Sequence, residues 1–216
     1  MSFISYYEKI KKERYKQNAE ICKDTAQLCL MGIEGKPQKY LVTKIKNAID
    51  RGLVYWATTN EILQKLSAGE RSYLAMFAID PTRQTLSEES QLNYVVNQRK
   101  LKIFKSSEDW RLTNDGSMIV KGKQIGSKSK SFDYVVENYF GVGKVTFSKG
   151  GHQDNVEEEV RKYLNECVNY TRFHDDEKKF FFLLDGDFWS DELISKLKKY
   201  ENNRVKIFNS DDYYLF

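Results

Sequence analysis

Residues 131–155 read SFDYVVENYFGVGKVTFSKGGHQDN, a pattern that predicts two β-strands joined by a tight turn and followed by a helix. Asp133 lies near the start of the first predicted strand. The second predicted strand carries Lys144 and Lys149, and a glycine pair then opens the helix. An acid that faces polar residues across a hairpin can form a metal-dependent phosphodiesterase site, although an ordinary half-buried hairpin has the same pattern.

The segments around this hairpin predict a mixed central sheet flanked by helices. The run FFFLLD at 180–185 is continuously apolar, which is typical of a central strand buried on both faces. The alternation of strand and helix patterns in the back half favours an α/β (α+β) fold. The expected strands span 132–137, 142–148, 179–185 and 204–208, and the expected helices span 154–170 and 190–200.

The front of the chain, residues 1–98, predicts a mainly helical N-terminal region. Its apolar residues recur at helical spacing, and glycines separate the periodic segments. Thr85 and Glu88 have the spacing of a capping box. The expected helices span 3–30, 37–52, 60–69 with Asn60 as N-cap, and 81–98.

Residues 99–216 are expected to form the mixed-sheet core, in one compact unit with the helical region. KLKIFK at 100–105 alternates charged and apolar residues, as a solvated strand does. Two short strands, 110–112 and 117–120, flank Asn114-Asp115-Gly116, which is a strong turn signal. These patterns add a strand and a hairpin upstream of the core sheet.

Composition favours a protein of the reducing cytoplasm. The 216-residue chain has no apolar run of 18 residues, and its first residues are charged without an apolar signal core. It has three cysteines, Cys22, Cys29 and Cys167, and only two histidines. We therefore expect no membrane span, no secretion signal and no zinc site of the Cys/His type.

Charge is distributed unevenly along the chain. Residues 1–130 hold 23 Lys/Arg and 14 Asp/Glu, whereas residues 131–216 hold 12 and 17. A basic front half suits a polyanionic partner such as nucleic acid. The more acidic back half suits either a metal site or a solvated surface.

Four motifs in the back half resemble one enzyme family. FDYVVE, KVTFSKGGHQDN, FFLLDGDFW and VKIFN occur in that order over about the last 85 residues. The set resembles the C-terminal core of PD-(D/E)xK restriction endonucleases, and most nearly the group that includes the DpnII and MboI enzymes. The resemblance implies a type II restriction endonuclease of the prokaryotic cytoplasm. It would act as a homodimer that hydrolyses double-stranded DNA with Mg²⁺.

The same resemblance implies roles for particular residues. Asp133 stands at the position of the first metal-binding acid. PTRQTLSEES resembles the helix that precedes the core in such enzymes, where Glu88 would approach the metal. Glu137 is a second candidate for an assisting carboxylate. Lys144 or Lys149 would stabilise the charge that develops on the phosphate.

The sequence departs from the family pattern at Lys144, which stands where the second acid is expected. A lysine repels a cation and donates where an acceptor is needed. Three explanations remain open: the acid comes from elsewhere in the chain, the protein is a non-catalytic subunit, or Lys144 replaces a glutamate.

Basic residues between positions 99 and 130 are the main candidates for DNA contact. Phosphate contacts would supply affinity, and side chains that reach the major groove would supply base recognition. Gln124, Lys128 and Lys130 are the candidates for base recognition, and Gln153 lies at a predicted helix start that suits a phosphate. The backbone candidates are Arg99, Lys100, Lys102, Lys105, Lys121, Lys123, Lys128 and Lys130. The alternatives are a non-catalytic DNA-binding subunit of this fold and a protein-interaction α/β domain.

Overall fold

The computed structural model describes residues 1–78, 83–100, 103, 106, 108–123, 130–147 and 153–214. The chain forms two compact units. The sheet unit comprises Met1–Tyr7 with Ser87–Phe216, and the helical unit comprises Glu8–Leu86. The division therefore falls within a helix near residue 86, and the first seven residues belong to the sheet unit.

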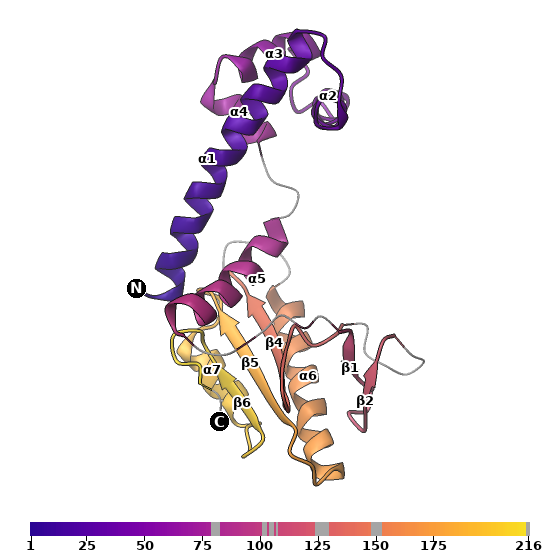
Figure 1. Ribbon diagram of the computed structural model, residues 1–216, viewed down its shortest axis with the longest axis vertical. Helices are drawn as coiled ribbons and strands as arrows, with labels where there is room; N and C mark the ends of the chain where they lie inside the picture. Colours follow the sequence, from indigo (N-terminus) through magenta and orange to yellow (C-terminus); the bar gives the residue numbers. More distant parts are fainter. Residues whose placement is uncertain are drawn as a thin grey trace. The chain divides into compact units, whose positions relative to one another are not determined.

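The sheet unit contains a four-stranded mixed sheet, as predicted (Figure 1). Strands β3 and β4 pair antiparallel, whereas β4, β5 and β6 are parallel. The strand order follows the chain. The bounds are β3 Tyr134–Val136, β4 Tyr139–Val145, β5 Lys179–Asp185 and β6 Val205–Phe208.

Helices cover both faces of this sheet, which explains the continuous apolar run in β5. Phe180, Phe182 and Leu184 pack in one core with residues of α6 and α7. Phe181 and Leu183 point to the other face and pack with residues of the π-helix η1, because successive side chains of a strand alternate between faces. The helices are α5 Arg83–Asn93, η1 Tyr94–Gln98, α6 Gln153–Phe173 and α7 Asp191–Lys198.

The turn between β3 and β4 lies earlier than the sequence pattern predicts. Glu137 and Asn138 form the turn, and Glu137 takes a positive φ of 51°. The second strand therefore begins at Tyr139 rather than at Val142 and ends at Val145. Gly143 lies inside this strand, where a Cβ would come within 2.7 Å of the Tyr134 hydroxyl oxygen.

A separate two-stranded hairpin confirms the turn predicted at Asn114-Asp115-Gly116. Strands β1 (Trp110–Leu112) and β2 (Ile119–Lys121) pair antiparallel. The carboxylate of Asp115 accepts hydrogen bonds from the Ser117 N–H at 3.0 Å and the Thr113 hydroxyl at 2.7 Å. Most of the strand predicted at 100–105 lies outside the described residues; Lys100 and Ile103, which are described, are not in a strand.

The helical unit contains a small apolar core of its own. Ile45, Ile62 and Leu66 are fully buried there with Phe77. No described helix is both long and apolar enough to cross a membrane. The helices are α1 Phe3–Leu30, α2 Lys36–Asp50, α3 Thr59–Ser67 and α4 Arg71–Phe77.

Two expected helix caps differ from the structure. Thr58, not Asn60, caps α3, and it forms a reciprocal capping box with Glu61. Helix α5 begins at Arg83, so Thr85 lies within its first turn rather than at its N-cap. Helix α3 begins one residue before its expected cap and α5 begins two residues before its expected cap, which are boundary shifts that periodicity alone does not resolve.

Candidate functional site

The β3–β4 hairpin brings Asp133 and Lys144 to the same face of the sheet. The register pairs Tyr134 of β3 with Gly141 of β4, so Asp133 lies opposite Val142. Lys144 is two residues further along β4 than Val142 and therefore lies on the same face of the sheet as Asp133. The backbone N–H of Gly143 donates to the Asp133 carboxylate at 2.9 Å. Asp133 is therefore held at the sheet edge by the backbone of its partner strand.

Two lysines surround this aspartate. Lys130 Nζ lies 3.6 Å from the Asp133 carboxylate. Lys130 and Lys144 lie close enough for each to affect the charge of the other. Lys144 Nζ contacts both carboxylate oxygens of Glu159 at 3.0 Å, and only 17% of the Lys144 side chain is exposed. The result is a cluster of two carboxylates and two amines, here called the lysine-carboxylate cluster.

Burial and charge act in opposite directions within the lysine-carboxylate cluster. Burial raises the pKa of Asp133, although Lys130 and the Gly143 N–H oppose the shift. Burial and the neighbouring charge of Lys130 lower the pKa of Lys144. Burial also disfavours the charge on Lys130, but Asp133 and Glu159 outweigh it and raise the Lys130 pKa. Lys130 is therefore the more firmly charged of the two lysines.

The described residues of the lysine-carboxylate cluster do not fit a Mg²⁺ ion. Mg²⁺ requires oxygen ligands, and it is bound through carboxylates with several waters. One oxygen of Asp133 already accepts from Gly143 and faces Lys130, and Lys144 adds a second amine, which would repel a cation. Among the described residues, no group of three or more His, Cys, Asp or Glu side chains could hold a metal ion.

The two candidate assisting carboxylates occupy different places. Glu88, on α5, lies close enough to Lys130 and Tyr134 to affect the charge of both groups. Glu137 is exposed in the β3–β4 turn, at the opposite end of β3 from Asp133. Glu88 therefore lies within electrostatic range of the lysine-carboxylate cluster, whereas Glu137 lies at the other end of β3.

A buried polar network anchors α5, which carries Glu88. Gln91 donates to the Asp185 carboxylate at 2.5 Å and to the Leu183 carbonyl at 3.2 Å, and it accepts from the Tyr134 hydroxyl at 2.7 Å. The N–H and hydroxyl of Ser210 also donate to Asp185, at 2.9 and 2.5 Å. Asp185 is 5% exposed, and burial raises its pKa. This network positions α5 over the sheet rather than offering a ligand to solvent.

The structure places only part of the predicted DNA-contact set. Arg99, Lys100 and Lys123 are exposed, whereas Lys121 is paired with Glu108 at 2.6 Å. Gln153 opens α6, and its side chain lies outside the description. Lys102, Lys105, Gln124, Lys128 and Lys149 lie outside the described residues.

Glu159 is a site residue that the sequence interpretation missed. It lies on α6 beside Val156 and Val160, which pack against the core, so helical periodicity indicates that it borders the buried stripe. Its contact with Lys144 joins residues 15 positions apart. Periodicity alone could place Glu159 near the sheet but could not identify its partner.

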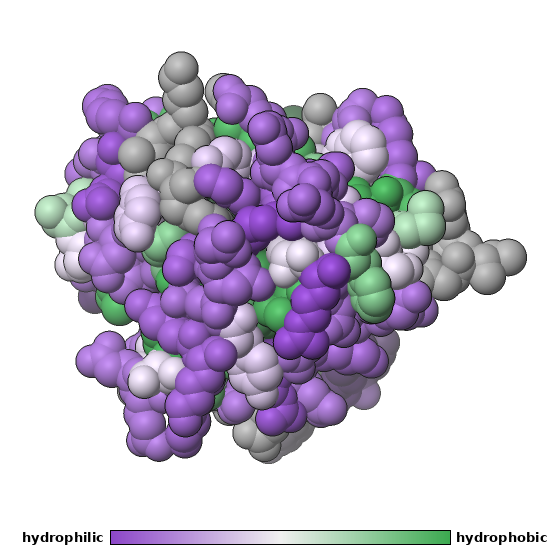
Figure 2. All heavy atoms as spheres, turned by 90° about the horizontal axis from the view of Figure 1, so that it is seen from below, coloured by the Kyte–Doolittle hydropathy of each residue, from purple (hydrophilic) through white to green (hydrophobic). Residues whose placement is uncertain are grey.

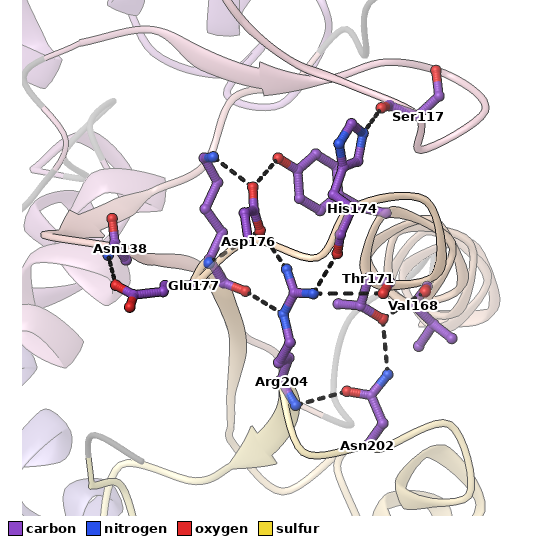
Figure 3. Close-up of polar contacts among 11 residues, drawn as sticks. Ser117, Asn138, Val168, Thr171, His174, Asp176, Glu177, Asn202 and Arg204 are labelled. Atoms are coloured by element: carbon purple, nitrogen blue, oxygen red, sulfur yellow. Dashed lines mark hydrogen bonds and ion pairs between the residues drawn. The ribbon is translucent and has the colours of Figure 1, made fainter.

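A second polar network lies at the other end of β5. The guanidinium of Arg204 donates to Asp176 at 2.5 Å, to the His174 carbonyl at 2.6 Å and to the Lys178 carbonyl at 2.9 Å (Figure 3). Partial burial disfavours the Asp176 charge, but hydrogen bonds from Lys178 and Tyr170 outweigh it and lower the Asp176 pKa to about 2. This network ties the end of α6 to β5 and β6.

The surface seen in Figure 2 is mainly hydrophilic, with hydrophobic residues in small separate areas. The described residues on that side therefore form no broad hydrophobic face on which another protein could dock.

Comparisons with protein-family models, curated proteins and solved structures find no match for this chain. Function is therefore inferred from the geometry of the lysine-carboxylate cluster.

Proposed function

We propose that this chain binds double-stranded DNA through an endonuclease-like core, with Lys130 and Lys144 at a backbone phosphate. The observation that carries the proposal is the pairing of these amines beside Asp133, where the family resemblance implies a metal ion. Two adjacent ammonium groups can neutralise a phosphate, which is the dominant source of affinity for duplex DNA.

The exposure of the two lysines supports this role. Lys130 is 34% exposed at its side chain and Lys144 is 17% exposed, so a phosphate can approach Lys130 first. Glu159, which is 48% exposed, can turn towards solvent when a phosphate replaces it as the partner of Lys144. Arg99 and Lys123 are further exposed cations of the sheet unit. The expected complex is a homodimer on a palindromic site, because a two-fold axis would relate both partners.

A Mg²⁺-dependent restriction endonuclease is the second candidate, and one observation favours it. Asp133 retains a fixed position at the sheet edge through the Gly143 N–H, as a metal-binding acid would require. Glu159 and Glu88 supply further carboxylates nearby. Hydrolysis would require that Lys144 be removed from the second-acid position, so we assign the chain as it stands to binding.

The proposal is tested by fluorescence anisotropy with a labelled mixed-sequence duplex over a salt series. Lys130→Gln and Lys144→Gln should each weaken binding to all sequences and reduce the slope of log Kobs against log salt by about 1. Lys196→Gln is the matched control, because Lys196 is 62% exposed on α7 and pairs with Glu192. Absence of salt-dependent binding, or equal slopes for wild type and both site variants, would refute the proposal.

A further inference from the structure

Helices α3 and α4 of the helical unit are joined by a tight, glycine-containing turn. Only Ala68, Gly69 and Glu70 separate them, and Gly69 takes a positive φ of 79°. The Gly69 N–H donates to the Leu66 carbonyl at 2.9 Å and the Glu70 N–H to the Lys65 carbonyl at 3.0 Å. This pair of bonds is a Schellman motif, which ends α3 and turns the chain into α4.

Packing against α2 leaves one face of α4 uncovered. Helices α2, α3 and α4 contact one another pairwise. α3 buries Ile62 and Leu66 and α4 buries Phe77 in their common core. The exposed residues of α4 are Arg71, Ser72, Ala75 and Met76. A three-residue turn that contains glycine has the length and composition of the turn in a helix-turn-helix, although αα-hairpins also use short turns.

Charge and surface chemistry of the helical unit suit duplex DNA. Residues 8–86 hold 14 Lys/Arg against 9 Asp/Glu, so the unit is basic in its own right. Tyr55 and Trp56, in the connection that leads to α3, are 76% and 64% exposed, and their rings lie 5.0 Å apart. In a helix-turn-helix the first helix crosses the DNA backbone, so this aromatic pair would lie beside the sugar-phosphate chain.

We infer that α3 and α4 form a DNA-reading helix-turn-helix, in which the exposed face of α4 enters the major groove. The inference rests on the proposed duplex binding and adds the source of its sequence preference. Arg71 has the chemistry to donate two hydrogen bonds to a guanine, and Met76 offers an apolar contact for a thymine methyl group. Ser72 lies between them in the chain and accepts or donates with either base pair.

The test uses the full chain and a library of randomised duplexes. The sequence enriched by the wild type is compared, by anisotropy, with single-base variants of itself for the wild type, Arg71→Ala and Arg71→Lys. Both Arg71 variants should lose roughly 5- to 150-fold of discrimination at one G·C position, because lysine cannot reproduce the bidentate contact. Arg51→Ala is the matched control, since Arg51 is exposed at the end of α2 and should leave the base preference unchanged.

The outcomes separate this inference from the proposed function. Loss of discrimination in both Arg71 variants, with circular dichroism and affinity for non-specific duplex retained, supports the helix-turn-helix. Duplex binding with no enriched sequence, or with an enriched sequence that Arg71→Ala reads equally well, overturns the helix-turn-helix and leaves the phosphate-binding core standing. Failure of the full chain to bind any duplex overturns both.

Discussion

Replacing Lys144 by glutamate should convert the lysine-carboxylate cluster from one that excludes Mg²⁺ into one that binds it. The Lys144–Glu159 contact of 3.0 Å corresponds to a Coulomb attraction of about 5 kcal/mol at an effective dielectric constant of about 20. Solvent screening at the half-exposed Glu159 reduces its net contribution to about 1 kcal/mol. Lys144→Glu loses this contribution and adds repulsion from Asp133 and Glu159, which attraction to the neighbouring Lys130 partly offsets, so we expect a total destabilisation of about 2 kcal/mol without metal.

Mg²⁺ should reverse this loss in the glutamate variant alone. A ligand present at 100 times its Kd stabilises the folded state by about 2.7 kcal/mol, which is similar to the expected destabilisation. In EDTA, Lys144→Glu should lower the Tm of the sheet unit by roughly 5–10 °C, and saturating Mg²⁺ should return most of it. Calorimetry with and without Mg²⁺ measures both shifts.

Lys144→Gln is the matched control for this prediction. It removes the ammonium group without supplying a carboxylate, so its Tm should not respond to Mg²⁺. Incubation with mixed-sequence duplex DNA should yield discrete Mg²⁺-dependent fragments from Lys144→Glu and none from Lys144→Gln or the wild type. If Mg²⁺ shifts the Tm of all three forms equally, or of none, then Lys144 does not hold a metal-ligand position and the reasoning fails.

Three stability measurements test other parts of the structure. Gln91→Leu removes the hydrogen bond to the buried Asp185 carboxylate and should lower the free energy of unfolding, measured in urea, by about 2–4 kcal/mol. Gln98→Leu, at an exposed site of η1, is the control and should change it little. Equal effects of the two substitutions would contradict the anchoring role of Gln91. Because the folded pKa of Asp176 is lowered to about 2, its stabilisation is present above about pH 4 and lost as the pH falls towards 2. Asp176→Asn should flatten that part of the pH profile, and an unchanged profile would count against the network. Thr58→Ala should cost about 1 kcal/mol through loss of the α3 cap, with Thr59→Ala as control; a larger loss from the control would show that the cap is misassigned.

Local sequence patterns determined most of the elements of this protein. The apolar run of β5 predicted a strand buried on both faces, and packing in two separate cores confirms it. The Asn114-Asp115-Gly116 signal predicted the β1–β2 hairpin, and the Asp115 side chain stabilises that turn through its near neighbours. These features depend on residues within a few positions of one another, so the sequence alone carries the physical information.

Tertiary structure decided the composition of the candidate site. Lys144 meets Glu159 only because α6 crosses back over the sheet, and Gln91 meets Asp185 across 94 positions of the chain. Gln91, on α5, likewise fills the space beside Gly143 of β4. Periodicity indicates which face a residue occupies, but which distant side chain it contacts is determined by how the helices pack on the sheet. The sequence therefore specified the strands, Asp133 and Lys144, and the packing of α6 on the sheet added Glu159 as the partner of Lys144.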